Sequence, residues 1–259
     1  MRHALVFGGF AVFVWAAGAN AQGISSGAVG LYGRFAVHYD PYYVMPAEKG
    51  GAGLDAGLNS WDLSSLGDRS DVFVSGKYGV IEGVEVGATA TVGSLFEYAP
   101  GVEKEALSAV VVGAKYQTLA AGATTVDVLL PVGDAGDPGL ALGQMWSTEM
   151  GNLGFNNHLQ VSFLDGYVVD GVNLDLLIQP VKEFGDGMFG YLDVEFFANT
   201  DEFGDTFNID LLPNVDVMLA EGLLLNGGVR INVYNGTDRS SDVGVRAGLI
   251  KTMELGGGY

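Results

Sequence analysis

The chain has 259 residues, a formal net charge of −19 at pH 7, 41 glycines and no cysteine. The missing cysteines exclude disulfides and thiolate chemistry, and the acidic balance argues against nucleic acid as a partner, because that needs basic patches. A mean hydropathy of +0.27 argues against disorder. The high glycine content disfavours long helices and suits the bends and crowded walls of sheets.

The first 21 residues have the pattern of a secretory signal. A basic start at residues 2–3 (Arg-His) precedes an apolar run over residues 4–17, and the small residues 19–21 (Ala-Asn-Ala) follow as a cleavage site. We place the cut after Ala21, which leaves residues 22–259 as the mature domain. An N-terminal membrane anchor is the alternative, but the apolar run is short for one. Export from a bacterial cell leads to the periplasm, the outer membrane or the medium.

Apolar and polar residues alternate with a period of two along nearly the whole mature chain, which is typical of strands with two different faces. In "GYLDVEFFA" (190–198), for example, Leu192, Val194 and Phe196 alternate with Asp193 and Glu195. The pattern predicts twelve strands, over residues 29–39, 71–80, 84–92, 107–119, 124–133, 139–150, 157–168, 172–184, 188–200, 207–220, 223–235 and 242–254.

The connections between these strands also alternate in length. Short connections follow the even-numbered strands, and longer or more polar ones follow the odd-numbered strands. This predicts an all-β fold, a transmembrane antiparallel up-and-down β-barrel of about twelve strands, with tight turns at one rim and longer loops at the other. The longest loop is expected at 41–70, where the glycine-rich "GGAGLDAG" could fold over or into the barrel mouth.

A secreted or periplasmic β-sandwich would alternate as well, and three features favour a barrel in lipid over it. The first is the export signal. The second is the small size of many residues on the polar face, as expected in a crowded barrel interior; they include Gly87, Gly113, Gly228, Gly244 and Gly248. The third is the aromatic residues on the apolar face near strand ends, where interfacial girdles lie; they are Tyr39, Tyr78, Tyr116, Tyr167 and Phe207.

The pattern over residues 28–259 resembles the small outer-membrane β-barrels of Gram-negative-type bacteria. The adjacent phrases "VGAKYQTL" and "VDVLLPVG" are similar to those of transporter-type barrels, including the phenol-degradation (MetA-pathway) family. The resemblance implies a porin-like or transporter-like barrel in the bacterial outer membrane, with membrane lipid as its partner outside and small molecules or ions as its permeants.

If the apolar face meets lipid, the charged residues of the other face line the lumen in an ordered way. We expect an acidic wall made of Asp127, Glu149, Asp175, Glu183, Asp193, Glu195, Asp210 and Asp216. We expect a basic wall, continuous across the last and first strands, made of Arg34, Lys77, Lys115, Arg230 and Arg246. Asp71 and Glu85 do not fit this order and are expected near strand ends.

Two charged walls facing each other would create a transverse field in which charged or dipolar solutes align. Because acidic residues outnumber basic ones, we expect a pore that passes small, preferentially cationic or dipolar solutes by diffusion. Twelve strands also allow a closed lumen in which the same charges form salt bridges. In that case the protein would be a structural or adhesion barrel, with outer loops that bind a partner.

The sequence offers little for catalysis, so we expect neither an enzyme nor a cofactor. A barrel hydrolase needs a histidine beside a serine or aspartate, but His158 and Ser162 are four residues apart on one strand, about 13 Å at roughly 3.3 Å per residue. His38 and Asp40 are more simply interpreted as ordinary polar residues at the barrel rim than as an acid–base pair. The acidic loops "GDAGDPG" and "TDEFGDTFNID" could hold divalent cations through oxygen ligands, although neither has EF-hand spacing.

Overall fold

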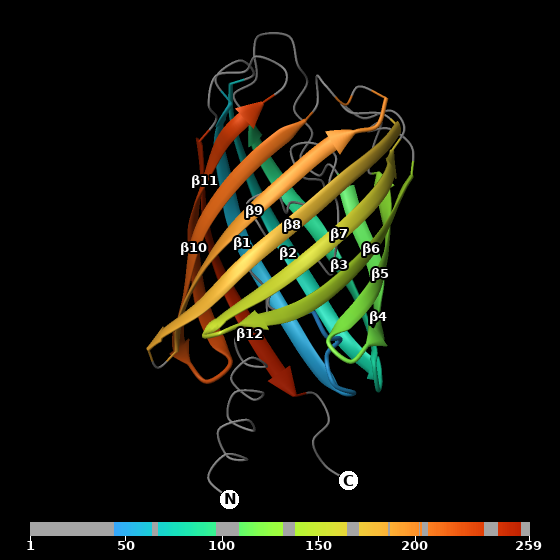
Figure 1. The fold of residues 1–259 in the computed structure, drawn as a ribbon, viewed down its shortest axis with the longest axis vertical. Helices are drawn as coiled ribbons and strands as arrows, with labels where there is room; N and C mark the ends of the chain where they lie inside the picture. The colour runs from blue at the N-terminus through green and yellow to red at the C-terminus, as the bar shows by residue number, and fades with distance from the viewer. Residues whose placement is uncertain are drawn as a thin grey trace, which may run out of the picture.

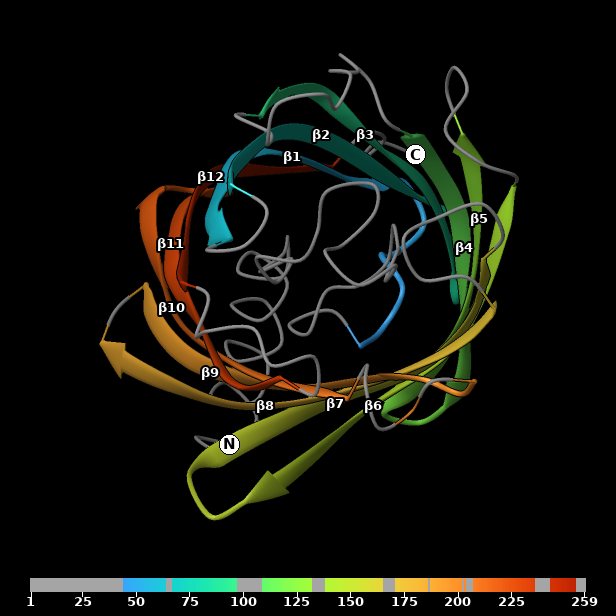
Figure 2. The ribbon, with the colours of Figure 1, turned by 90° about the horizontal axis from the view of Figure 1, so that it is seen from above.

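The computed structural model describes residues 44–254, apart from 64–66, 97–108, 132–137, 165–170, 186, 202, 204–206 and 236–242. The described residues form twelve antiparallel strands that close into one barrel (Figures 1 and 2). The strands are β1 (Gly51–Leu63), β2 (Gly67–Ile81), β3 (Val84–Phe96), β4 (Ala109–Leu119), β5 (Gly122–Pro131), β6 (Gly139–Met150), β7 (Leu153–Leu164), β8 (Gly171–Gly185), β9 (Met188–Asn199), β10 (Asn208–Ala220), β11 (Leu223–Asn235) and β12 (Val243–Glu254). No helix in this described part of the chain is long and apolar enough to span a membrane.

The predicted all-β, up-and-down barrel is confirmed, and β2 to β12 begin and end within four residues of the predicted bounds. The prediction for the first strand is wrong. The strand that pairs with both β2 and β12 is Gly51–Leu63, inside the segment 41–70 that was expected to be a loop. Residues 29–39 lie outside the described residues, and β1 fills the position that was expected for them.

The first strand was missed because its composition is typical of a loop. Glycine has a low strand propensity, and "GAGLDAG" is mostly glycine and alanine. The segment nevertheless alternates, because Leu54 and Leu58 are 50% and 42% exposed on the outside while Asp55 is buried on the inside. The small residues also make room, since a Cβ on Gly57 would lie 2.7 Å from the ring of Phe73 on β2.

Five connections of two residues each join successive strands at one end of the barrel, here named the short-turn rim; they are residues 82–83, 120–121, 151–152, 186–187 and 221–222. Gly83, Gly187 and Gly222 have φ values of 73°, 77° and 65°, a left-handed conformation that favours glycine and suits two-residue hairpins. Connections at the other end, the long-loop rim, span 3 to 12 residues by the strand bounds. The predicted alternation of short and long connections is therefore confirmed.

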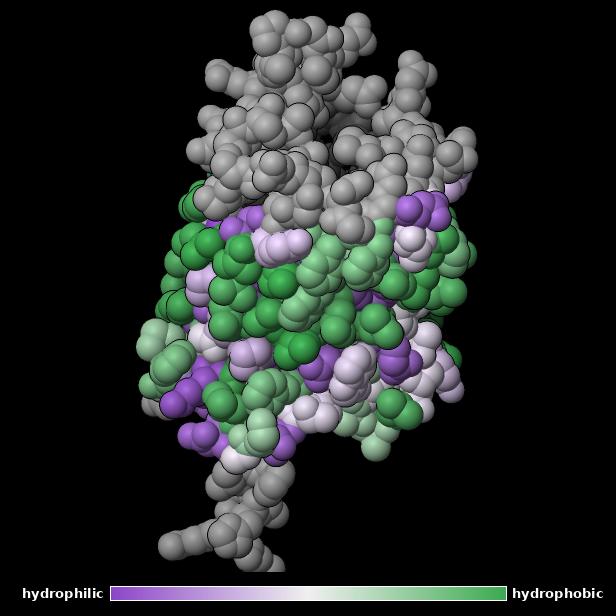
Figure 3. Space-filling view, turned by 45° about the horizontal axis from the view of Figure 1, so that its top comes forward, coloured by the Kyte–Doolittle hydropathy of each residue, from purple (hydrophilic) through white to green (hydrophobic). Residues whose placement is uncertain are grey.

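The two faces of the sheet differ as the sequence predicts. On the outward face large apolar side chains are exposed, for example Val74 at 47%, Val126 at 42% and Leu249 at 50%. Figure 3 shows a band of apolar side chains across the face of the barrel wall that is in view. On β9, Asp193 and Glu195 point inward and are 0% and 2% exposed. The outward face is thus suited to hydrocarbon, and the inward face is polar.

Exposed aromatic side chains lie near both rims of the barrel. Tyr78, Tyr116 and Phe184 are 41%, 58% and 61% exposed near the short-turn rim, and Tyr234 is 51% exposed at the other end. This arrangement is typical of the girdles that mark membrane interfaces. Among the other predicted girdle residues, Phe207 is half-buried and stacks on Phe203 with ring centroids 5.5 Å apart, whereas Tyr39 and Tyr167 lie outside the described residues.

Several inward glycines provide space for a larger side chain on the neighbouring strand. Gly113 lies directly opposite Asp127, and a Cβ on Gly113 would come within 2.0 Å of the Asp127 Oδ1 atom. Gly228 lies opposite Asn214 in the same way, with a distance of 1.8 Å from the added Cβ to the Asn214 Oδ1 atom. The crowded interior predicted from glycine placement is therefore present at these positions.

An arginine on the outward face should destabilise the barrel in a depth-dependent way. Val194→Arg, in the middle of β9, is expected to lower the free energy of unfolding by about 2–4 kcal/mol, because it places a charge in hydrocarbon. Val233→Arg, near the long-loop rim, is the matched control and should cost about 0–1 kcal/mol. Urea unfolding in lipid vesicles measures both, and equal losses would contradict a lipid-facing outer surface.

Candidate functional site

The inner face of β5 to β11 carries polar side chains that are at most 4% exposed, here named the polar belt. Its members are Thr125, Asp127, His158, Gln160, Ser162, Asn173, Asp175, Gln179, Asp193, Glu195, Asn199, Asn208, Asp210, Asn214, Asp216, Asn226, Arg230 and Asn232. Amide side chains are as prominent as charged ones. Because buried polar groups need hydrogen-bond partners, the contacts among these residues define the chemistry of the lumen wall.

One chain of hydrogen bonds crosses five consecutive strands, from β6 to β10, and is here named the amide ladder. The Ser147 hydroxyl donates to Asn156 Oδ1 at 2.8 Å, and Asn156 Nδ2 donates to Gln179 Oε1 at 3.2 Å. Gln179 Nε2 donates to Asp193 Oδ1 at 2.7 Å, and Asn214 Nδ2 lies 3.4 Å from the other oxygen, Asp193 Oδ2. The Asp193 carboxylate is thus held between two amides, which fixes its position on the wall.

A second group joins β9, β10 and β11 closer to the short-turn rim. Asn226 Nδ2 donates to the Tyr191 hydroxyl oxygen at 2.6 Å and also to Asp216 Oδ1. The Tyr191 hydroxyl lies 3.4 Å from the same Asp216 oxygen. An aromatic hydroxyl and an amide therefore surround this second carboxylate.

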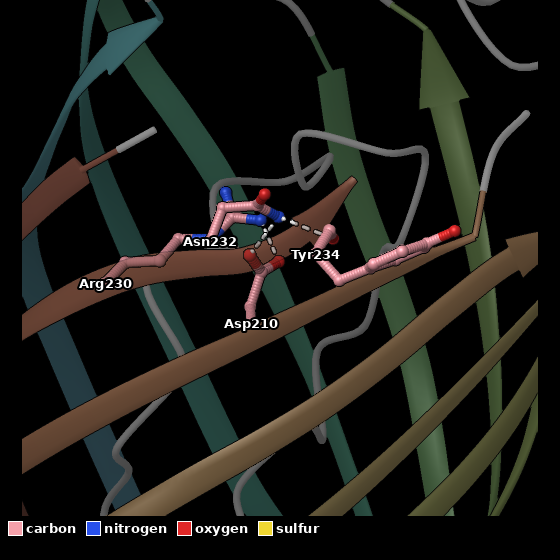
Figure 4. A network of polar contacts seen from close by, with 4 residues as sticks. All are labelled: Asp210, Arg230, Asn232 and Tyr234. Atoms are coloured by element: carbon pink, nitrogen blue, oxygen red, sulfur yellow. Dashed lines mark hydrogen bonds and ion pairs between the residues drawn. The ribbon is translucent and has the colours of Figure 1, made fainter. Parts of the chain in front are cut away.

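A third group contains a buried ion pair between β10 and β11 (Figure 4). Arg230 on β11 donates from Nη2 to Asp210 Oδ2, and Asn232 Nδ2 donates to the other oxygen, Asp210 Oδ1, at 2.8 Å. Glu195 on β9 lies directly opposite Asp210 in the strand register. Arg230 thus pairs with Asp210, and a second buried carboxylate, Glu195, lies beside this pair on the neighbouring strand.

A further ion pair lies across the lumen wall on β3 and β4. Lys115 Nζ is 3.6 Å from Glu85 Oε1, and the two side chains are 0% and 1% exposed. The second carboxylate oxygen of Glu85 accepts a hydrogen bond of 2.9 Å from the backbone N–H of Ala47. Glu85 therefore connects the wall to a segment that precedes the first strand.

That segment, residues 44–50, lies inside the ring of strands, where Figure 2 draws it in blue; it is here named the N-terminal strap. The backbone N–H of Gly50 donates to the Gly79 carbonyl at 2.8 Å. A Cβ on Gly79 would lie 2.0 Å from the Glu48 carbonyl oxygen, so the strap can lie this close only because residue 79 is glycine. The strap is at the short-turn rim, where β1 begins, rather than in a long loop at the opposite rim.

The predicted acidic residues divide into two groups. Six of them are buried on the inner face; they are Asp127, Asp175, Asp193, Glu195, Asp210 and Asp216. Glu149 and Glu183 keep the inward parity but are exposed at the short-turn ends of β6 and β8. The structure thus places these six carboxylates on β5 and on β8 to β10, and two further buried carboxylates, Glu85 and Asp55, on β3 and β1.

The predicted basic residues are placed differently from one another. Lys77 is half-buried on β2, and Lys115 and Arg230 are buried and contact carboxylates of neighbouring strands. Arg246 lies on β12 directly opposite Gly228, and its side chain is outside what the structure describes. Arg34 lies outside the described residues altogether. Charges of opposite sign therefore meet between neighbouring strands within the wall.

Sequence reasoning overlooked the amides and Asp55. Asp55 is 4% exposed on β1, on the side expected to be basic. Its alternation with Leu54 and Ala56 was a usable signal. Gln179, Asn214 and Asn226 also alternate with apolar neighbours in the sequence, so their inward direction could have been predicted. They were overlooked because only charged residues were considered as lumen-lining.

The part of the chain that the structure describes holds no group of three or more metal-ligating side chains. The acidic loop "GDAGDPG" lies mostly outside the described residues, as do several positions of "TDEFGDTFNID". Divalent cation binding at these loops stays a prediction.

Removing one partner of the buried Arg230–Asp210 pair should be costly. Arg230→Met is expected to lower the free energy of unfolding by about 3–5 kcal/mol, because it leaves buried carboxylates without their cation. The double variant Arg230→Met/Asp210→Asn should recover part of the loss. Urea unfolding in vesicles measures both, and a double variant no more stable than the single one would contradict the coupling of the two residues.

Comparison with known proteins finds similarity in fold. No family model and no curated protein matches this chain. Among solved structures it is similar to an outer-membrane channel from Pseudomonas putida F1, with a TM-score of 0.63 and 9% identity over 83% of this chain and 100% of the channel. It is also similar to the NanC porin, with a TM-score of 0.54 and 11% identity over 77% of this chain and 99% of the porin. The KdgM porin, solved in complex with disordered oligogalacturonate, has a TM-score of 0.53 and 10% identity over 77% of this chain and 98% of the porin. The chain therefore has the fold of the small outer-membrane channels and porins.

Proposed function

We propose that this protein is a bacterial outer-membrane pore through which small solutes diffuse. The observation that carries the proposal is the closed barrel with an apolar outside and a charged, amide-rich inside. The fold is shared with proteins described as channels and porins, and an export signal in residues 1–21 would bring the chain to that membrane. In such barrels the short turns face the periplasm.

The proposed selectivity is for cationic or dipolar solutes. On the described inner face the carboxylates outnumber the cationic side chains Lys77, Lys115 and Arg230. Fixed negative charge along a narrow aqueous path favours cations, and the concentration of carboxylates on β8 to β10 gives the lumen a transverse field. Arg246 and Arg34 are proposed to add to the opposite side.

Neutralising two carboxylates of the acidic wall should lower the preference for cations. The barrel is reconstituted in planar bilayers, and its reversal potential is measured in a KCl gradient. Wild type should be cation-selective, and Asp193→Asn/Glu195→Gln should reduce its K⁺/Cl⁻ permeability ratio at least about twofold, since each fixed charge contributes to the local potential. Glu82→Gln/Glu221→Gln, with the same charge change in exposed turns, is the control and should have little effect in high salt. Anion selectivity of wild type would overturn the sign of the proposal.

A barrel with a closed lumen and partner-binding loops is the second candidate function. The N-terminal strap favours it, because this segment lies inside the short-turn rim and is attached to β2 and β3 through Gly79 and Glu85. The Arg230–Asp210 and Lys115–Glu85 pairs are also what a closed lumen would contain.

Displacing the strap distinguishes the two candidates. Gly79→Val should expel it, because the added Cβ would collide with the Glu48 and Ala47 carbonyl oxygens. Gly76→Val on the outward face of the same strand is the matched control, since a Cβ there meets only the Leu54 side chain at 3.4 Å. We expect single-channel conductance to rise at least about twofold in Gly79→Val, because loss of the strap would widen a narrow lumen. Conductance should stay unchanged in the control. A well-folded barrel that conducts in neither form would favour the closed barrel instead.

A further inference from the structure

Two polar side chains converge over Gly143 on β6, Thr125 from β5 and His158 from β7, and a third polar residue, Gln160, lies beside Gly143 on β7. Strand register places Thr125 directly opposite Gly143, and Gly143 directly opposite Gln160. A Cβ on Gly143 would lie 2.3 Å from His158 Nε2 and 2.4 Å from Thr125 Oγ1. These polar atoms therefore occupy the space that the glycine leaves open. Thr125, His158 and Gln160 around Gly143 are here named the Gly143 niche.

Two side chains of the niche, Gln160 and Thr125, are buried without a hydrogen-bond partner in the part of the chain that the structure describes. Gln160 is 1% exposed, and neither its Oε1 nor its Nε2 atom has a hydrogen-bond partner in the structure as described. The same is true of Thr125 Oγ1, on a residue that is 0% exposed. An unsatisfied buried polar group costs about 1–3 kcal/mol, so a folded barrel keeps such groups where water or a ligand completes their bonds.

The polar surface continues from the niche along β8 and β9. Asp175 lies directly opposite Gln160, and Phe197 lies directly opposite Asp175. Asn173, next to Asp175 on the same face, has an Nδ2 atom without a hydrogen-bond partner in the described structure. The row thus presents donors, acceptors and one aromatic ring within a few strand widths of about 4.8 Å each.

The mixture of donors and acceptors indicates the chemical class of the ligand. A metal cation would use only the oxygen atoms, and an anion would use only the N–H and O–H donors. A hydroxyl group both donates and accepts, so the hydroxyl groups of one molecule suit both the Gln160 amide and the Thr125 hydroxyl.

We propose that the Gly143 niche binds neutral polyhydroxylated solutes, of the sugar or polyol class, as they pass along the lumen. This inference rests on the proposed pore for its role in transport, but binding itself does not depend on conduction. For solutes of this class, the field of the charged wall would orient the dipole of the molecule, and the niche would form hydrogen bonds with its hydroxyl groups.

Glucose is the probe for the first experiment, added to the barrel in planar bilayers while the KCl current is recorded. We expect a saturable reduction of the current by glucose. Gln160→Leu removes the unpartnered amide, and Gly143→Ala puts a methyl group where the polar atoms converge. Each variant should raise the half-blocking glucose concentration about fivefold or more, because one hydrogen bond contributes about 1 kcal/mol. Gln144→Leu, one residue from the niche, is the control and should block like wild type, since Gln144 bonds to Thr124 and to the Ala123 carbonyl instead.

Calorimetry of the refolded barrel in detergent measures glucose binding without any need for current. Weaker binding in both niche variants, with unchanged binding in Gln144→Leu, supports the proposal even if no variant conducts, and in that case only the proposed pore fails. If the barrel conducts but glucose neither blocks the current nor binds, the proposed binding at the niche is wrong, and the proposed pore is unaffected. Binding that is equal in wild type and both niche variants also overturns it, because glucose would then bind elsewhere.

Discussion

The need to satisfy every backbone hydrogen bond in a medium without water determines the rest of this structure. Hydrocarbon offers no partner to a backbone N–H or C=O group, so a spanning sheet must close on itself. Pairing of β1 with β12 completes that closure. A closed sheet has only two faces, and a period of two along each strand then assigns alternate side chains to lipid and to lumen. The exposed leucines and valines and the buried carboxylates are two results of one constraint.

Closure also crowds the inner face, and the sequence meets this in two ways. Glycine placed opposite a larger residue gives that residue room, as at Gly113 with Asp127. Amide side chains bridge from strand to strand, as Gln179 does between Asn156 and Asp193. A neutral amide provides a donor and an acceptor at once, and burying it costs less than burying an unpaired charge. The full charges Arg230 and Lys115 lie beside carboxylates for the same reason.

Much of the fold could be predicted from the sequence because period-two alternation is a local property. The inward parity of Asp193 and Glu195 follows from their neighbours alone, whatever strand lies beside them. The partners of these residues could not be predicted, because contacts between strands depend on register. Gln179 is 14 residues from Asp193, and their contact depends on the length of one two-residue turn. The first strand was missed because a Gly-Ala segment has the composition of a loop, and the N-terminal strap was missed because its contacts are made mainly by backbone atoms.

The chain order of the strands has a consequence for assembly. Each hairpin joins neighbours in the chain through short connections, so most pairing is local and has a low entropic cost of loop closure. The β1–β12 seam instead joins opposite ends of the strand series, from Gly51 to Glu254. Long-range pairing of this kind is slow, because its entropy must be lost before its contacts form. Until the seam closes, β1 and β12 present two open strand edges, and open edges are where chains aggregate. We therefore expect the open sheet, before the seam closes, to be the stage of assembly most exposed to aggregation.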